Sequence, residues 1–136
     1  MADDIILAKS AIIERRVASV HEVHAGNDAA FARDLTRQDA IVLNLQSACE
    51  ASIDLAMHLV RVRRLGVPQE SREAFDLLER AGLINSDLAL RMKRMVGFRN
   101  VAVHDYRKLD LDVVRSIIGA RLPDFCDFTH AALTLM

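Results

Sequence analysis

The sequence predicts an all-α protein, an antiparallel bundle of four-helix type with an additional short helix. Hydrophobic residues make up 51% of the 136 positions, which is enough to fill a core. Aromatic residues account for only 4%, so a mainly aliphatic core is expected. The chain has 5 glycines and 2 prolines, too few for a loop-rich β protein. A chain of this length is expected to form one domain, residues 1–136.

Two long helices are predicted in the first half of the chain. The first begins after the acidic segment ADD and runs to about Ala25, with isoleucine and valine at helical spacing. The second is the longest, from about Thr36 to Leu65, and Thr36 with Asp39 resembles a capping box at its start. The segment LGVP, residues 65–68, ends it.

Three further helices are predicted in the second half. A short one over about 71–81 has Ser71 as its N-cap candidate, and Gly82 suits the position after its end. Ser86 can cap the next helix, which reaches about residue 103. Asp110 can cap the last, and Pro123 should kink or restart it. Its buried residues are predicted to be Leu111, Val113, Val114, Ile117 and Ile118.

Charge and cysteine content narrow the functional class. The net charge of −1 excludes a globally basic nucleic-acid binder but allows a local basic patch. The two cysteines, Cys49 and Cys126, lie inside apolar helical patterns and are expected to be buried, reduced thiols, as in a cytoplasmic protein. The acidic N-terminus does not resemble a signal peptide, and no apolar run approaches the roughly 20 residues of a membrane helix.

The segment GFRNVAVHDY, residues 97–106, carries the candidate chemistry. On a helical wheel Arg99 continues the apolar stripe of Leu88, Met92 and Met95, a costly position for a guanidinium unless it meets an anion or a wet cleft. One reading is a structural ion pair with an acidic residue of the long helix, Glu50 or Asp54. The other reading is a functional site.

A functional reading pairs Arg99 with His104. On an unbroken helix the two side chains diverge by about 140°, so they converge only if the helix ends between them or a second subunit contributes. Together they suit RNA cleavage, in which histidine moves a proton and arginine stabilises the charge on phosphorus. Asn100 could orient the histidine or bind phosphate. This chemistry requires no metal and no cofactor.

RNVAVHDY matches the Arg-Asn-x-x-x-His-x-Tyr motif of the HepT-like branch of the HEPN superfamily, which the chain resembles. Two other segments are similar to the family pattern: DAIVLNLQSACEASIDLAMHLV, residues 39–60, and LGVPQESREAFDLLERAGLI, residues 65–84. The resemblance covers nearly the whole chain and is firmest over residues 35–118. It leads us to expect a single HEPN bundle.

The resemblance also implies a function. Family members are ribonuclease toxins of two-gene toxin–antitoxin systems and act on RNA as homodimers whose paired motifs face one cleft. The antitoxin is a minimal nucleotidyltransferase that silences the toxin by transferring AMP to the motif tyrosine, here Tyr106. That AMP would add a bulky anion beside Arg99. The alternative is a non-catalytic HEPN binding module that serves a nucleotidyltransferase partner.

Several other charged residues have predicted roles near the motif. Glu50, Asp54 and His58 share one helix face, which is weak as a metal site and more typical of ion pairing with Arg91 or Arg99. Family members carry acidic groups near the motif arginine, so Asp54 is a candidate supporting residue. The run RMKR, residues 91–94, supplies Arg91 and Arg94 as a candidate RNA-binding rim. Met92 and Met95 are predicted to be exposed and to form the basis of a homodimer interface.

Overall fold

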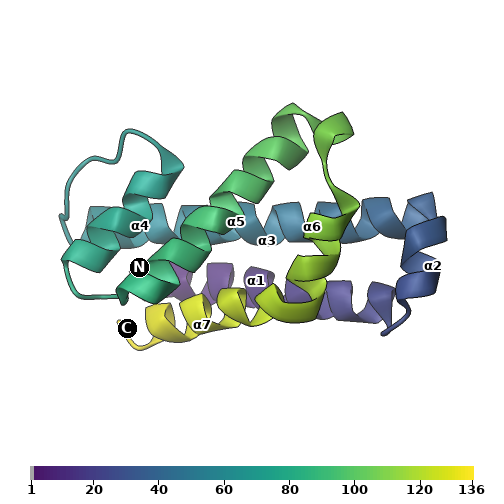
Figure 1. Cartoon of the computed structure of the whole chain (residues 1–136). Helices are drawn as coiled ribbons and strands as arrows, with labels where there is room; N and C mark the ends of the chain where they lie inside the picture. The colour runs from purple at the N-terminus through teal and green to yellow at the C-terminus, as the bar shows by residue number, and fades with distance from the viewer. Residues whose placement is uncertain (1) are drawn as a thin grey trace.

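Four long helices form an antiparallel bundle in the computed structural model, which describes residues 2–136 (Figure 1). Helix α1 (Ala2–His24) lies along α3 (Leu35–Val62), α5 (Ser86–His104) crosses in front of α3, and α7 (Leu122–Leu133) completes the layer beside α1. Both ends of the described chain lie at the same end of the bundle. No strand occurs in this part of the chain, so the predicted all-α fold class is confirmed.

Shorter segments join the long helices. Helix α4 (Ser71–Arg80) is the predicted short helix between α3 and α5, and Gly82 follows its end with a positive φ of 75°. Helix α2 (Asp28–Arg33) was not predicted. After α5 come a 3₁₀ turn η1 (Tyr106–Lys108), α6 (Leu111–Ser116) and a π-helical turn η2 (Ile117–Arg121). Pro123 lies in the first turn of α7, so its predicted restart of the helix is confirmed.

The predicted helix caps were correct at one position and wrong at three. Asp110 caps α6, where its carboxylate accepts from the backbone N–H of Asp112. Helix α3 begins one residue before Thr36, and its cap is Asp34. Asn85, one residue before Ser86, caps α5. Ser71 is the first residue of α4 instead of its cap, which leaves its hydroxyl free for another contact.

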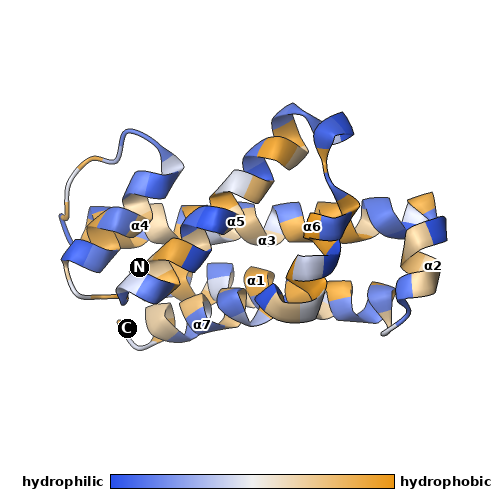
Figure 2. Cartoon of the chain, in the orientation of Figure 1, coloured by the Kyte–Doolittle hydropathy of each residue, from blue (hydrophilic) through white to orange (hydrophobic). Residues whose placement is uncertain are grey.

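The phenylalanine side chains are concentrated in the core. All five phenylalanines are buried, and Phe75 and Phe128 meet edge to face at 5.3 Å between ring centroids. Figure 2 shows hydrophobic residues along the inner faces of the four long helices. The core is mainly aliphatic, as predicted, and all five phenylalanines are placed inside it.

Two predictions of burial were wrong. Val113 is 45% exposed, because α6 turns only Val114 of its middle residues fully into the core. Cys126 is exposed on α7, whereas Cys49 is buried on α3 as predicted. Burial, with a contribution from neighbouring Glu50, raises the pKa of the Cys49 thiol. No helix of residues 2–136 is both long enough and apolar enough to span a membrane.

Candidate active site

The motif residues lie at the end of α5 and in the turn that follows it. Helix α5 runs through both Arg99 and His104, and the chain leaves the helix at Asp105. The helix therefore does not end between the arginine and the histidine, and their side chains project from different faces of α5. The first of the two predicted routes to convergence, a helix end between the two residues, is therefore absent.

Arg99 is held between three helices with little of its side chain exposed (17%). Its Nη2 donates to the Ser71 hydroxyl of α4 at 3.0 Å, and its Nε lies 3.5 Å from Oε1 of Glu50 on α3. The predicted ion pair with an acidic residue of the long helix is thus confirmed for Glu50. The Nε–H is buried and faces this carboxylate, but it forms no close hydrogen bond within residues 2–136, so the ion pair is a loose one.

His104 and Asn100 occupy a more open position. His104 is exposed in the last turn of α5, and Asn100 is half-buried one turn earlier. An exposed imidazole at a helix end is accessible to a ligand. Arg99 is thus fixed in place, and His104 is accessible.

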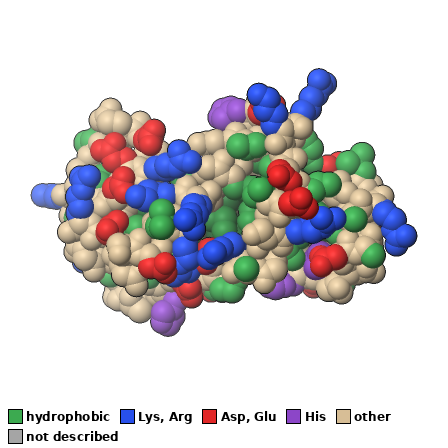
Figure 3. All heavy atoms as spheres, in the orientation of Figure 1, with side chains coloured by type: hydrophobic (Ala, Val, Ile, Leu, Met, Phe, Trp, Pro, Cys, Tyr) green, Lys and Arg blue, Asp and Glu red, His purple; other side chains and the backbone are tan. Residues whose placement is uncertain are grey.

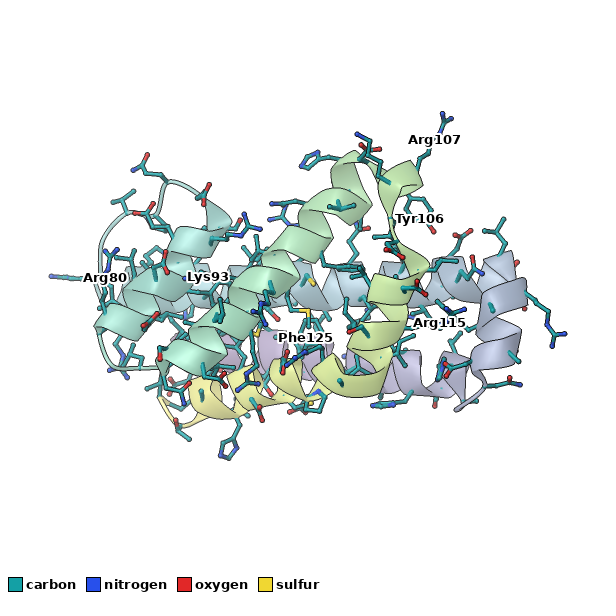
Figure 4. The ribbon with its side chains drawn as sticks, viewed as in Figure 1. Arg80, Lys93, Tyr106, Arg107, Arg115 and Phe125 are labelled. Atoms are coloured by element: carbon teal, nitrogen blue, oxygen red, sulfur yellow. The ribbon has the colours of Figure 1, made fainter. Side chains whose placement is uncertain are left out.

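Tyr106 points from η1 back to α3. Its hydroxyl donates to Oδ1 of Asp39, while the neighbouring Arg107 extends away from the ribbon (Figure 4). Partial burial of Tyr106 and the bond to Asp39 raise its pKa to about 12. A shallow groove of about 340 Å³ runs beside the ring along α3, lined by Asp39, Val42, Leu43, Gln46 and Tyr106. The sequence pattern predicted that Asp39 takes part in capping the helix. In the structure its carboxylate accepts a hydrogen bond from Tyr106 instead.

The structure assigns Asp54 a partner other than Arg99. Its carboxylate pairs with Lys9 of α1 at 3.1 Å and is about half exposed. Glu50, one turn earlier on α3, is the acidic group beside Arg99. No contact in the structure therefore supports the role predicted for Asp54. No cluster of three or more histidine, cysteine or carboxylate groups that could hold a metal occurs in residues 2–136.

Arg91 forms ion pairs with three carboxylates. Its guanidinium and Nε contact Asp87 at 2.9 Å and both Asp124 and Asp127 at 2.8 Å, which ties α5 to α7 and raises the pKa of the arginine. RNA phosphate would have to displace three anions to reach it, so Arg91 does not suit the predicted RNA-binding rim. Arg94, on the next turn, is exposed.

The sequence pattern missed one cation beside the motif. The Arg72 side chain, at the start of α4, lies across α5 at Gly97, where its Nε donates to the Lys93 carbonyl at 3.3 Å. A Cβ added at Gly97 would lie 2.7 Å from Nη2 of Arg72. The sequence did contain a signal for this contact, because a glycine inside a helix often marks a position where another group lies close to the backbone.

An apolar groove of about 630 Å³ separates α5 from the α6–η2 segment. Figure 3 shows hydrophobic side chains in a hollow on this face, with Lys and Arg gathered to one side of it. Its apolar lining comes from Met95, Phe98, Val101, Leu109, Val113 and Ile117. The prediction that Met92 and Met95 are exposed was wrong, since they are 1% and 4% exposed and fill the core of this chain.

An all-helical bundle that holds an arginine between three helices and an accessible histidine on the same helix has the architecture of a HEPN protein. The family model described as Ribonuclease HepT-like matches residues 12–132. The chain therefore belongs to the HepT-like ribonuclease family, as its motif predicted.

Individual relatives agree with this assignment. The chain is 45% identical to the mRNA nuclease HepT of Shewanella oneidensis over 126 residues, which is 93% of this chain and 94% of the relative. It is similar, at 44% identity and a TM-score of 0.90, to the tri-AMPylated HEPN toxin of that organism solved in complex with MNT antitoxin. A toxin–antitoxin structure with AMP-PNP gives the same identity and TM-score. Both alignments cover 94% of this chain and 96% of the solved one.

Proposed function

We propose that the protein is the toxin of a toxin–antitoxin pair and cleaves RNA with Arg99 and His104, without a metal ion. The observation that carries the proposal is the position of Arg99. Its guanidinium is held by Ser71 and by Glu50, and its buried Nε–H faces the Glu50 carboxylate without forming a close hydrogen bond, on the same helix as an accessible histidine. A purely structural arginine would be expected to pair its donors more closely.

The roles follow from the chemistry of the groups. His104 takes or delivers a proton at the 2′-hydroxyl or the leaving oxygen. Arg99, already oriented, stabilises the charge that develops on the phosphoryl oxygens. Asn100 supports them by contacting phosphate or the imidazole, and Arg94 offers an exposed cation to the RNA backbone.

Cleavage is expected to be independent of divalent metal. Purified protein incubated with messenger RNA in excess chelator should cleave at the same rate as without chelator, because the two motif side chains supply both the proton transfer and the positive charge. A preparation of the Arg99→Ala variant serves as the control for contaminating nuclease. Loss of cleavage in chelator with recovery on added magnesium would contradict the proposal.

The active form is proposed to be a homodimer. Within one chain Arg99 and His104 project from different faces of α5, and a two-fold related copy can present the missing group of each pair. Exposed Val101 and Val103 on α5, 39% and 44%, and the groove beside them offer apolar surface for such an interface.

Light scattering at micromolar concentration is expected to give twice the mass of the chain, since two copies that complete each other's site must form a stable pair. Val101→Glu should shift the mass to that of a monomer and reduce cleavage, whereas Leu90→Glu, a similarly exposed apolar position on the same helix, serves as the matched control. A wild-type monomer that cleaves RNA would refute the homodimer.

The partner is proposed to be a cognate minimal nucleotidyltransferase antitoxin acting in the same cytoplasm. The relative of 44% identity is described as tri-AMPylated and in complex with MNT antitoxin. Tyr106 is the only tyrosine of this chain, is 46% exposed and stands in the motif turn, so we assign it as the AMP acceptor.

A further inference from the structure

We propose that the carboxylate of Asp39 is the general base that takes the phenolic proton when AMP is transferred to Tyr106. The inference rests on the proposed role of Tyr106 as acceptor and adds a catalytic residue supplied by the toxin itself. It assigns part of the chemistry of neutralisation to the protein that is neutralised.

The geometry places the base on the reacting atom. The Tyr106 hydroxyl donates to Oδ1 of Asp39, across 67 positions of sequence, so the contact is made by the fold and not by a local turn. Asp39 is exposed on the second turn of α3. A phenol that donates its proton to a carboxylate keeps its oxygen lone pairs directed away from that carboxylate, available to an incoming phosphorus.

Because the phenol is a very weak acid, AMP transfer to it requires a base. With a pKa of about 12, roughly one Tyr106 hydroxyl in 10⁵ is ionised at neutral pH. A neutral phenol is a weak nucleophile, so efficient transfer requires its proton to leave as the new bond forms. Asp39 is the group in contact with that proton.

The step balances with a nucleoside triphosphate as co-reactant. The Tyr106 oxygen attacks the α-phosphorus of ATP held by the antitoxin, and the bond from that phosphorus to the bridging oxygen of pyrophosphate breaks. Pyrophosphate leaves with the electron pair, and the phenolic proton passes to Asp39. The products are adenylyl-Tyr106, pyrophosphate and a protonated carboxyl, which then releases its proton to solvent.

The surface around the pair is open to a reactant carried by another protein. The groove beside Tyr106 is bounded by Val42, Leu43 and Gln46, and Leu43 is 61% exposed. Of the five residues that line the groove, Asp39 alone carries a charge that would repel a triphosphate. Tyr106 is therefore held in place by Asp39 while 46% of the residue remains exposed.

The test compares Asp39→Asn with the wild type in complex with antitoxin and ATP. The asparagine carbonyl still accepts the phenolic hydrogen bond but takes no proton at neutral pH. We expect the rate of AMP addition to Tyr106, followed by intact-protein mass spectrometry at saturating antitoxin, to fall about a hundredfold or more. Asp39→Glu should recover part of the rate. Asp28→Asn, the same change at another exposed aspartate, should leave the rate unchanged.

The outcomes separate this inference from the proposed function. Modification of Asp39→Asn at the wild-type rate or faster would overturn the base while leaving Tyr106 as acceptor. A change only in the antitoxin concentration needed for half-maximal rate would likewise overturn it, since that result marks a docking contact. Absence of any AMP on wild-type Tyr106 would overturn the acceptor assignment, and the base with it.

A separate observation concerns RNA binding, and from it we propose that Arg72 contacts the RNA backbone in the place predicted for Arg91. The inference rests on the proposed ribonuclease activity. Arg72 has no carboxylate within ion-pairing distance among residues 2–136, unlike Arg91, so its charge is not already neutralised. It follows Ser71, whose hydroxyl holds Arg99, and therefore lies beside the motif.

Gly97 gives this proposal an unusual test. A methyl group at Gly97 would meet the flexible end of Arg72 at 2.7 Å and displace it, while alanine improves the helix itself. We expect Gly97→Ala to raise Tm by a few degrees, about 3 °C, yet to raise KM for RNA about tenfold. Arg72→Gln should raise KM similarly and reduce the salt dependence of binding by about 0.7 in log–log slope.

Arg80→Gln is the matched control, because Arg80 is an exposed arginine at the opposite end of α4 (Figure 4). Its KM should stay at the wild-type value. Unchanged KM in both Gly97→Ala and Arg72→Gln, in preparations that cleave RNA, would overturn the role of Arg72. Failure of every preparation to cleave RNA, the wild type included, would overturn the proposed function and this contact together.

Discussion

Arg99→Ala is expected to lower the rate of RNA cleavage by about 10²- to 10³-fold, the usual effect of removing a preorganised charge-stabilising donor. His104→Ala should cost about 10²- to 10⁴-fold because a general acid or base is lost. Both should abolish toxicity on induction in cells. A variant that remains toxic at equal abundance would contradict the catalytic assignment.

The fold should survive both substitutions. His104 is exposed. Arg99→Ala removes the partner of only two groups, the partly exposed Glu50 carboxylate and the Ser71 hydroxyl, and water can hydrogen-bond to both. The stability cost is expected to be about 1 kcal/mol or less, measured by thermal unfolding. Arg99→Lys provides a matched control, since it keeps the charge and loses the planar, two-pronged donor geometry. A strong loss of cleavage in the lysine variant would assign the effect to geometry rather than to charge.

Mixing the two inactive variants tests whether each site is shared between copies. If Arg99 of one copy acts with His104 of the other, a mixed dimer of Arg99→Ala and His104→Ala contains one intact site and one doubly defective site. Random mixing then restores about a quarter of the wild-type activity. If both groups act within one copy, the mixture stays inactive. The position of both residues on the continuous helix α5 leads us to expect restoration.

Tyr106→Phe is expected to escape neutralisation completely. The variant keeps the ring and loses the acceptor oxygen, so it should gain no AMP mass and remain toxic when the cognate nucleotidyltransferase is co-expressed. The lost bond to exposed Asp39 should cost about 1 kcal/mol or less in stability, because water replaces the hydroxyl. Normal neutralisation through an AMP adduct on another residue would show that Tyr106 is not the switch.

The structure also changes the expected manner of neutralisation. The sequence pattern placed the AMP anion beside Arg99. On α3, however, the partner of Tyr106 is Asp39 and the partner of Arg99 is Glu50, and these positions are separated by about 16 Å along the helix axis. We therefore expect a single AMP on Tyr106 docked at Asp39 to obstruct the approach to the site, without pairing its phosphate with Arg99 of the same chain.

The sequence by itself determined the helical fold, the order of the four long helices and α4, and the family. Helical periodicity can be read from a short stretch of sequence, because residues three and four apart share one face of a helix independently of the rest of the chain. The end of α3, the restart at Pro123 and the exit from α5 after His104 were predictable for the same reason. The motif was recognisable because its four residue types stand at fixed spacing.

Only the tertiary structure decided which partner each polar side chain takes. Met92 and Met95 share the stripe of Arg99, but packing against the neighbouring helices buries the methionines and leaves the guanidinium to Ser71 and Glu50. The pairing of Tyr106 with Asp39 depends on how η1 lies against α3, which no local pattern encodes. Such contacts join residues far apart in the chain, and the crossing angles and relative positions of packed helices, set by the whole core, determine which of them meet.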